Sequence, residues 1–77
     1  MATTAAPALR NPQAQFVVGN PAVRGWKNEE AATELEVDGE TADAAARYRR
    51  AAQAWTEAQE PERAAWCGAQ ADRLEAK

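Results

Sequence analysis

The amino-acid sequence predicts an all-α protein in which a short helix precedes a long antiparallel helical hairpin at residues 41–76. Three observations lead to this fold class. Alanine accounts for 21 of the 77 residues, apolar side chains recur at helical spacing through residues 44–74, and the Glu60-Pro61 step interrupts that spacing once. We therefore divide the chain into an amino-terminal arm at residues 1–25 and a small helical domain at residues 26–77.

The amino-terminal arm is predicted to be disordered or extended. Residues 1–15 contain two prolines, no hydrophobic periodicity and little that a fold would bury. Phe16-Val17-Val18 are β-prone and precede the turn signal Gly19-Asn20-Pro21, so we expect a short extended segment there. This segment either lies as a strap across the helices or serves as a linear motif for a partner. Residues 21–25 are expected to continue the irregular path.

The first helix is predicted to be short, from Asn28 to about Glu36. Asn28 is a suitable N-cap, and Glu29 and Glu30 then lie in the first turn, where carboxylates interact favourably with the helix dipole. The Asp38-Gly39 pair is a helix-ending signal, so the helix is expected to stop just before it.

The second helix has the clearest periodicity and is predicted to run from Thr41, as its cap, to about Gln59. Its large apolar residues fall within one narrow sector of a helical wheel, and the opposite sector is mostly polar. We therefore expect one buried and one exposed face. The buried face comprises Ala44, Tyr48, Ala51, Trp55 and Ala58, and the exposed face comprises Asp43, Ala46, Arg50, Gln53 and Glu57.

The third helix is predicted to run from Pro61 to about Glu75. Proline is favoured at the first position of a helix and pushes the preceding residue, Glu60, out of the helical region. The connection is therefore very short, and such a connection makes the two helices pack antiparallel. The face predicted to be buried comprises Ala64, Cys67, Gly68, Ala71 and Leu74.

The predicted core is under-filled. Only fourteen apolar residues are larger than alanine, and burial stabilises in proportion to area, at about 25 cal/mol per Å². We therefore expect low to moderate stability, with a partner or self-association as a means of completing the core. The main core candidates are Trp26, Leu35, Tyr48, Trp55, Cys67 and Leu74.

The hairpin also matches parts of a 34-residue helical repeat pattern. Tyr48, Ala51-Ala52 and Trp55 occupy the places of its first-helix aromatics and small pair, and Ala64 and Ala71 occupy the small positions of its second helix. In these residues the segment from about 41 to 76 resembles one degenerate unit of the tetratricopeptide family. The resemblance implies a helical scaffold that holds a peptide or helix in a groove, without catalysis and without a cofactor.

The sequence departs from this family at three positions. Ala51 replaces the usual leucine, Gly68 stands where the second-helix aromatic is expected, and Ala76 stands where a proline often closes the unit. A register one helix earlier also fits in part, through Gly39, Ala44, Tyr48 and Ala51. Both registers predict stacked helices of tetratricopeptide-like type.

The residue inventory argues against an enzyme. The sequence has no histidine and no serine, so the usual general base near neutral pH and the Ser-His-Asp triad are lacking. The single Cys67 is expected to be a small buried apolar residue, since zinc sites need several thiol or imidazole ligands. We expect no catalytic residues, no cofactor and no metal site.

Without an apolar run of about 20 residues, we also expect a cytoplasmic protein without membrane contact.

Trp66 lies outside the predicted buried face of the third helix. On a helical wheel it is about 160° from Ala64 and about 140° from Ala71. Such a tryptophan is either covered by Trp26 or Phe16, or exposed as an anchor for a protein or peptide, a second copy of the chain included. The predicted partner-binding residues are Trp66, Arg63, Arg73, Gln70 and Phe16, with a cation–π contact available from the arginines.

The charges are distributed unevenly along the chain. Residues 1–28 carry three bases and no acid, whereas residues 29–77 carry all twelve acids and six bases. A second hypothesis is therefore a small nucleic-acid-associated regulator, whose contacts would come from Arg10, Arg24 and Lys27 together with Arg47, Arg49 and Arg50. The acidic body and a pI near 4.9 argue against a nucleic-acid partner.

Overall fold

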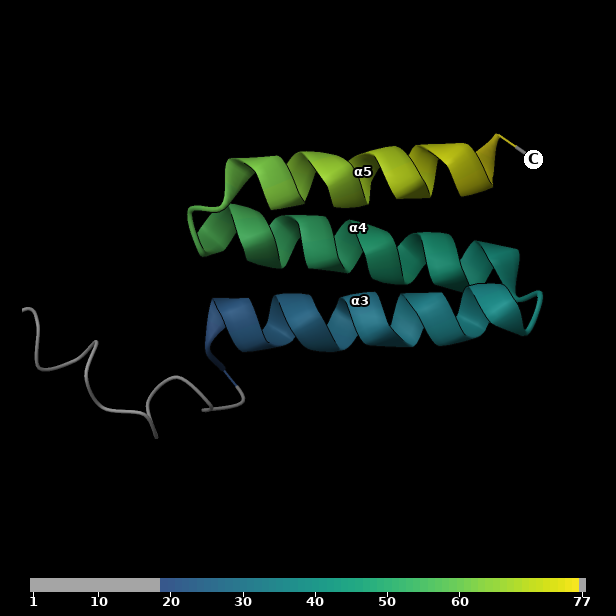
Figure 1. Cartoon of the computed structure of the whole chain (residues 1–77), viewed down its shortest axis with the longest axis horizontal. Coiled ribbons are helices and arrows are strands. Elements are labelled where there is room, and N and C mark those ends of the chain that lie inside the picture. The colour runs from purple at the N-terminus through teal and green to yellow at the C-terminus, as the bar shows by residue number, and fades with distance from the viewer. Residues whose placement is uncertain (1–18, 77) are drawn as a thin grey trace, which may run out of the picture.

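The computed structural model describes residues 19–76, which form three helices named α3 (Pro21–Val37), α4 (Thr41–Glu57) and α5 (Pro61–Glu75). The helices lie side by side in one layer with α4 in the middle, and each runs antiparallel to the next (Figure 1). The predicted all-α fold class is thereby confirmed. The predictions for residues 1–18 fall outside the described residues.

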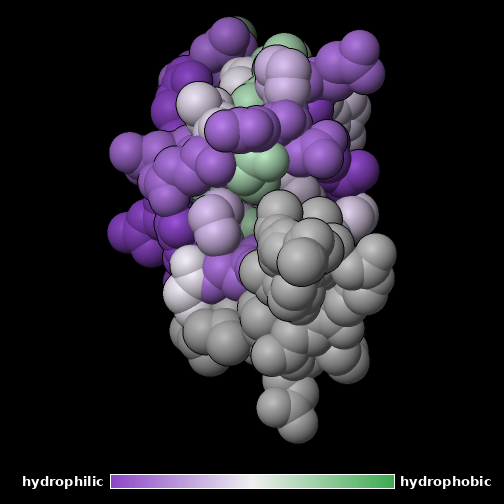
Figure 2. Space-filling view, turned by 90° about the vertical axis from the view of Figure 1, so that its left-hand side faces the viewer, coloured by the Kyte–Doolittle hydropathy of each residue, from purple (hydrophilic) through white to green (hydrophobic). Residues whose placement is uncertain are grey.

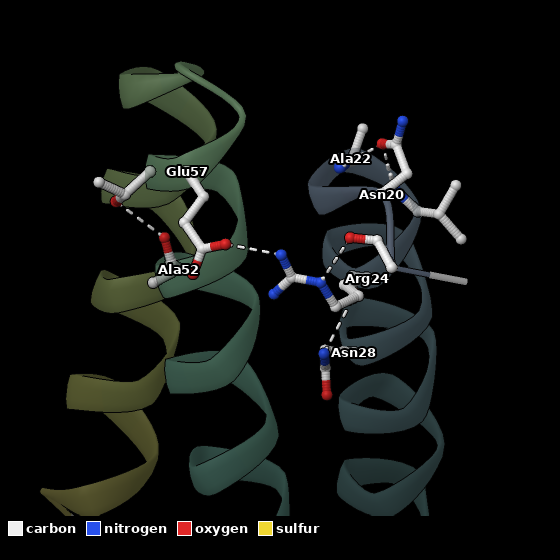
Figure 3. A network of polar contacts seen from close by, with 9 residues as sticks. Asn20, Ala22, Arg24, Asn28, Ala52 and Glu57 are labelled. Carbon is white, nitrogen blue, oxygen red and sulfur yellow. Dashed lines mark hydrogen bonds and ion pairs between the residues drawn. The ribbon is translucent and has the colours of Figure 1, made fainter. Parts of the chain in front are cut away.

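Helix α3 begins at Pro21 and not at Asn28, so the prediction of a short first helix was wrong. The Asn20 side chain caps the helix by accepting hydrogen bonds from the backbone N–H groups of Ala22, at 2.9 Å, and Val23, at 3.4 Å (Figure 3). Pro21 then occupies the first helical position, where its missing N–H costs nothing. Residues 21–25 therefore belong to the helical layer and not to the arm.

Helices α3 and α4 end in the same way, with a residue of positive φ that reverses the chain. Gly39 has φ 82° after α3, and Gln59 has φ 62° after α4. In both turns the residue after the positive-φ residue donates its backbone N–H to the carbonyl oxygen of the residue five positions earlier. Glu40 donates to Leu35 in the first turn, and Glu60 donates to Trp55 in the second. Helix α4 therefore stops at Glu57, short of the predicted Gln59. At its other end, Thr41 is the first helical residue and not the cap.

The core lies along both sides of α4 and consists largely of alanine. Alanines let the helices approach closely, and the few large side chains fill the remaining space. Of the predicted core candidates, Tyr48, Trp55, Cys67 and Leu74 are buried and Leu35 is partly buried, whereas Trp26 is 54% exposed, which contradicts the prediction. The buried cluster comprises Ala32, Ala44, Ala45, Tyr48, Ala51, Trp55, Cys67, Ala71 and Leu74.

Exposed ion pairs tie the middle helix to its neighbours. Arg24 of α3 meets Glu57 of α4 at 2.6 Å (Figure 3), and Arg49 of α4 meets Asp72 of α5 at 2.7 Å and also Glu75. Exposed pairs of this kind contribute little to stability, because water and salt screen them. Figure 2 shows the end of the layer where α3 and α5 begin, with hydrophilic residues around scattered hydrophobic ones.

Gly25 of α3 is buried beneath the Trp55 ring of α4. A Cβ built on Gly25 would lie 2.5–2.9 Å from three atoms of that ring, closer than real Cβ contacts. A larger residue at position 25 would therefore collide with the Trp55 ring unless the ring or the helix moved. Gly68 in α5 differs, because a Cβ added there would have no neighbouring atom within 4 Å.

We expect Gly25→Ala to lower the free energy of unfolding. The forced shift of Trp55 or of α3 costs about 1–3 kcal/mol, more than the roughly 0.5–1 kcal/mol that alanine gains over glycine in a helix. Gly68→Ala is the matched control and should raise stability by about 0.5–1 kcal/mol. Urea unfolding followed by circular dichroism measures both. Equal stabilisation by both variants would show that Trp55 does not rest on Gly25.

Candidate partner-binding face

Two half-exposed tryptophans occupy equivalent positions in the outer helices. Trp26 is the sixth residue of α3 and 54% exposed, and Trp66 is the sixth residue of α5 and 52% exposed. Each meets a buried aromatic of α4 edge to face: Trp26 meets Trp55 at 5.4 Å between ring centroids, and Trp66 meets Tyr48 at 5.9 Å. Such contacts add about 0.5–1.5 kcal/mol beyond burial and fix the orientation of the rings.

Both tryptophans belong to one surface of the layer. Tyr48 and Trp55 are seven residues apart in α4, about two helical turns, so they project from the same side of that helix. The tryptophans that contact them must therefore flank that side. We call the surface formed by Trp26, Arg63 and Trp66, with Trp55 and Tyr48 beneath it, the tryptophan face.

Arg63 of α5 lies across the tryptophan face toward α3. Its guanidinium carbon is 4.0 Å from the Trp26 ring centroid and 4.6 Å from that of Trp55, which is cation–π geometry. Its Nη2 atom lies 3.7 Å from Glu29 Oε1, while its Nε atom is buried without a hydrogen-bond partner. The predicted cation–π contact exists, but with Trp26 and Trp55. The predicted role of Arg63 in binding a partner beside Trp66 stays a prediction.

Glu29 joins all three helices beneath this face. Its carboxylate accepts hydrogen bonds from Trp55 Nε1 of α4 and from Cys67 Sγ of α5, the latter at 3.4 Å, and it also faces Arg63. The Glu29 side chain is only 15% exposed. From the sequence, Glu29 was expected only to lie in the first turn of a helix. Its partners lie far away in the sequence, so no local pattern predicts these contacts. Glu29 beneath the face and Trp26 on it are the two residues of this site that the sequence analysis did not include.

Cys67 is fully buried, as predicted, and its chemistry follows from that position. Burial, together with the hydrogen bond to the Glu29 carboxylate, raises the pKa of the thiol to about 12. The thiol therefore stays protonated at neutral pH and lacks the reactivity of a thiolate nucleophile.

Arg73 and Gln70 form a second bridge between α5 and α3. Arg73 donates to Gln70 Oε1, at 3.0 Å from Nε and 2.8 Å from Nη2, and to Glu36 Oε2 at 2.9 Å. The structure therefore brings the predicted residues Arg73 and Gln70 together on the turns that follow Trp66, and the Arg73 charge is paired within the chain.

Trp66 is not covered by Trp26. The Trp26 ring contacts Trp55 and Arg63 instead, so that part of the covering interpretation was wrong. Phe16 lies outside the described residues, so its predicted role stays a prediction. The half-exposed state of Trp66 is what the anchor interpretation requires.

The arginines of the alternative hypothesis are dispersed and largely engaged. Arg49 pairs with Glu75 and Asp72, which raises its pKa above the usual range, and Arg47 donates to Asn28 Oδ1 at 3.1 Å. Arg24 pairs with Glu57. Arg50 and Asp43 line a shallow hollow between α3 and α4. Lys27 is exposed and, like Arg50, forms no ion pair within residues 19–76. Arg10 lies outside the described residues.

Within residues 19–76, no cluster of three or more His, Cys, Asp or Glu side chains is arranged to bind a metal ion. None of the helices in this part of the chain has the length and apolar content required to cross a membrane. No family model matches the chain, and searches of curated proteins and of solved structures also give no match.

We expect Glu29→Ala to lower the free energy of unfolding by about 1–3 kcal/mol, because Trp55 Nε1 loses its acceptor and the Arg63 guanidinium loses its counter-ion in a largely buried place. Glu30→Ala is the matched control on the same helix, since Glu30 is exposed and makes no ion pair among the described residues. Its effect should stay within about 0.5 kcal/mol. Urea denaturation provides the comparison, and equal losses would contradict the role assigned to Glu29.

We expect Cys67 of the folded protein to resist a thiol-specific reagent such as Ellman's reagent at pH 8. With a pKa of about 12, only about one thiol in ten thousand is ionised at that pH, and the side chain is fully buried. Reaction should become fast in concentrated guanidinium chloride, where the pKa returns toward its ordinary value. A folded protein that reacts as fast as the unfolded one would refute the assignment.

Proposed function

We propose that this chain is a small non-catalytic helical interaction module that binds a protein or peptide through the tryptophan face. The observation that supports the proposal is the pair of half-exposed indoles, Trp26 and Trp66, fixed over buried aromatics of the middle helix. Tryptophan is enriched among the residues that contribute most to binding energy in interfaces.

The geometry of these two indoles suits binding. Each ring is held edge to face against a rigid helix, so little side-chain freedom remains to be lost when a partner covers it. Roughly half of each side chain is still exposed to water, and covering that surface contributes about 25 cal/mol per Å². A partner that spans both rings would therefore gain from two preordered anchors at once.

The tetratricopeptide-like resemblance supports the same class of function as an analogy. Antiparallel helices with alanine at their contacts are what such scaffolds require. The helix starts at Pro21 and Pro61 are forty residues apart, however, whereas the tetratricopeptide unit repeats at 34. We therefore propose a helical layer of related type.

We expect Trp66→Ala to abolish capture of the partner while the protein stays folded. Loss of the edge contact with Tyr48 should cost about 0.5–1.5 kcal/mol of stability beyond the burial that the indole provides. Loss of an interface anchor costs about 2 kcal/mol or more of binding energy. Affinity capture from an extract of the source cells measures binding, and thermal unfolding measures stability. Light scattering on the unmodified protein and on Trp66→Ala tests whether the captured partner is a second copy of this chain.

Gln53→Ala serves as the control, because Gln53 is exposed on the face of α4 opposite its buried aromatics. This variant should capture the partner as the unmodified protein does. The proposal fails if Trp66→Ala retains full capture, or if Trp66→Ala is unfolded at the temperature of the assay, in which case Trp66 is a core residue.

A further inference from the structure

The described part of the chain carries an excess of unpaired acids. Residues 19–76 contain twelve acidic and seven basic side chains, a net charge of −5. Five of the acids form ion pairs within this part of the chain, and the remaining seven form none there. These seven are Glu30, Glu34, Asp38, Glu40, Asp43, Glu60 and Glu62.

Two of the unpaired acids stand beside the exposed tryptophans. Glu30 follows Trp26 by four residues in α3, and Glu62 precedes Trp66 by four residues in α5. Side chains four residues apart on a helix lie on the same face, one turn from each other. Both glutamates are exposed. Each half-exposed indole therefore has a free carboxylate within one helical turn.

An indole beside a carboxylate is a site for a cationic side chain, and the chain contains one such site already filled. The Arg63 guanidinium lies over the rings of Trp26 and Trp55 with the Glu29 carboxylate 3.7 Å away. The ring faces attract the cation through their quadrupole, and the carboxylate neutralises it. The outer surfaces at Trp26 and Trp66 offer the same two groups to a side chain from outside.

We propose that the occupant of the tryptophan face is a cationic segment of a protein, whose arginine or lysine side chains contact Trp26 and Trp66 and pair with Glu30 and Glu62. This inference rests on the proposed function and adds the chemistry of the partner. An acidic segment would meet the net negative charge of the helical layer, and the two basic residues of α5 are already paired with Glu29 and Glu36.

The test uses the full chain labelled with nitrogen-15 and three synthetic peptides of equal length. The first peptide alternates arginine with leucine, the second replaces each arginine by glutamate, and the third replaces each leucine by serine. The indole N–H signals of Trp26, Trp55 and Trp66 report separately on each ring. The Trp55 signal is an internal reference, because that N–H is bonded to Glu29 in the core.

We expect the arginine–leucine peptide to shift the Trp26 and Trp66 signals and to leave Trp55 nearly unchanged. The glutamate peptide should bind at least about tenfold more weakly, since it brings like charges together. The double variant Glu30→Gln/Glu62→Gln should lower the affinity for the arginine–leucine peptide by about fivefold. Glu40→Gln is the matched control: Glu40 is exposed at the opposite turn and forms no ion pair within residues 19–76, so its replacement should leave the affinity within about twofold.

Several results would overturn the inference without touching the proposed function. Equal binding of the arginine and glutamate peptides would mean that the face binds without preference for cations. Equal weakening by Glu40→Gln and by the double variant would mean unspecific attraction to the acidic protein. If the Trp26 and Trp66 signals shift when the protein is diluted, the occupant is a second copy of the chain. If they shift in Phe16→Ala without any peptide, the occupant is the amino-terminal segment. If no peptide shifts them while Trp66→Ala loses its captured partner, the partner is not cationic.

Discussion

The contact of Trp55 with its neighbours fixes the arrangement of the three helices. Its ring rests directly on the α3 backbone, because Gly25 has no side chain. Its N–H is bonded to Glu29 of the same helix, and its ring is covered by Arg63 of α5. One indole of the middle helix is thereby joined to both outer helices. Because most of the remaining core is alanine, which buries little area, this contact determines the spacing of the layer more than any other.

Much of the fold could be predicted because the controlling signals are local. Periodicity and the proline at position 61 indicated the hairpin, its buried faces and the antiparallel connection. The start of α3 was mispredicted because Gly19-Asn20-Pro21 signals a turn and a capped helix equally well, and the choice depends on packing against α4. Trp26 was misplaced in the core for a related reason. Alanines bring the helices so close that their seam has no room for a further indole.

The candidate site was only partly predictable. The position of Trp66 outside the buried face follows from the helical period alone, and the proximity of Gln70 and Arg73 from their spacing of three residues. The direction of Arg63 and the role of Glu29 depend on how α3 lies beside α5, and no local pattern contains that information. Residues that connect helices distant in the sequence are therefore the ones that sequence reasoning failed to find.

The layered arrangement also bears on how the chain folds. The backbones that pack most closely belong to helices consecutive in the sequence, α3 with α4 and α4 with α5 (Figure 1). A native state built from such short-range pairings has a low contact order, and domains of this kind fold in microseconds to milliseconds. The bridges from Arg63 and Arg73 to α3 are the principal contacts that must wait for all three helices. The arginine bridges across the surface that carries Trp26 and Trp66 therefore form only after both helix pairs have formed.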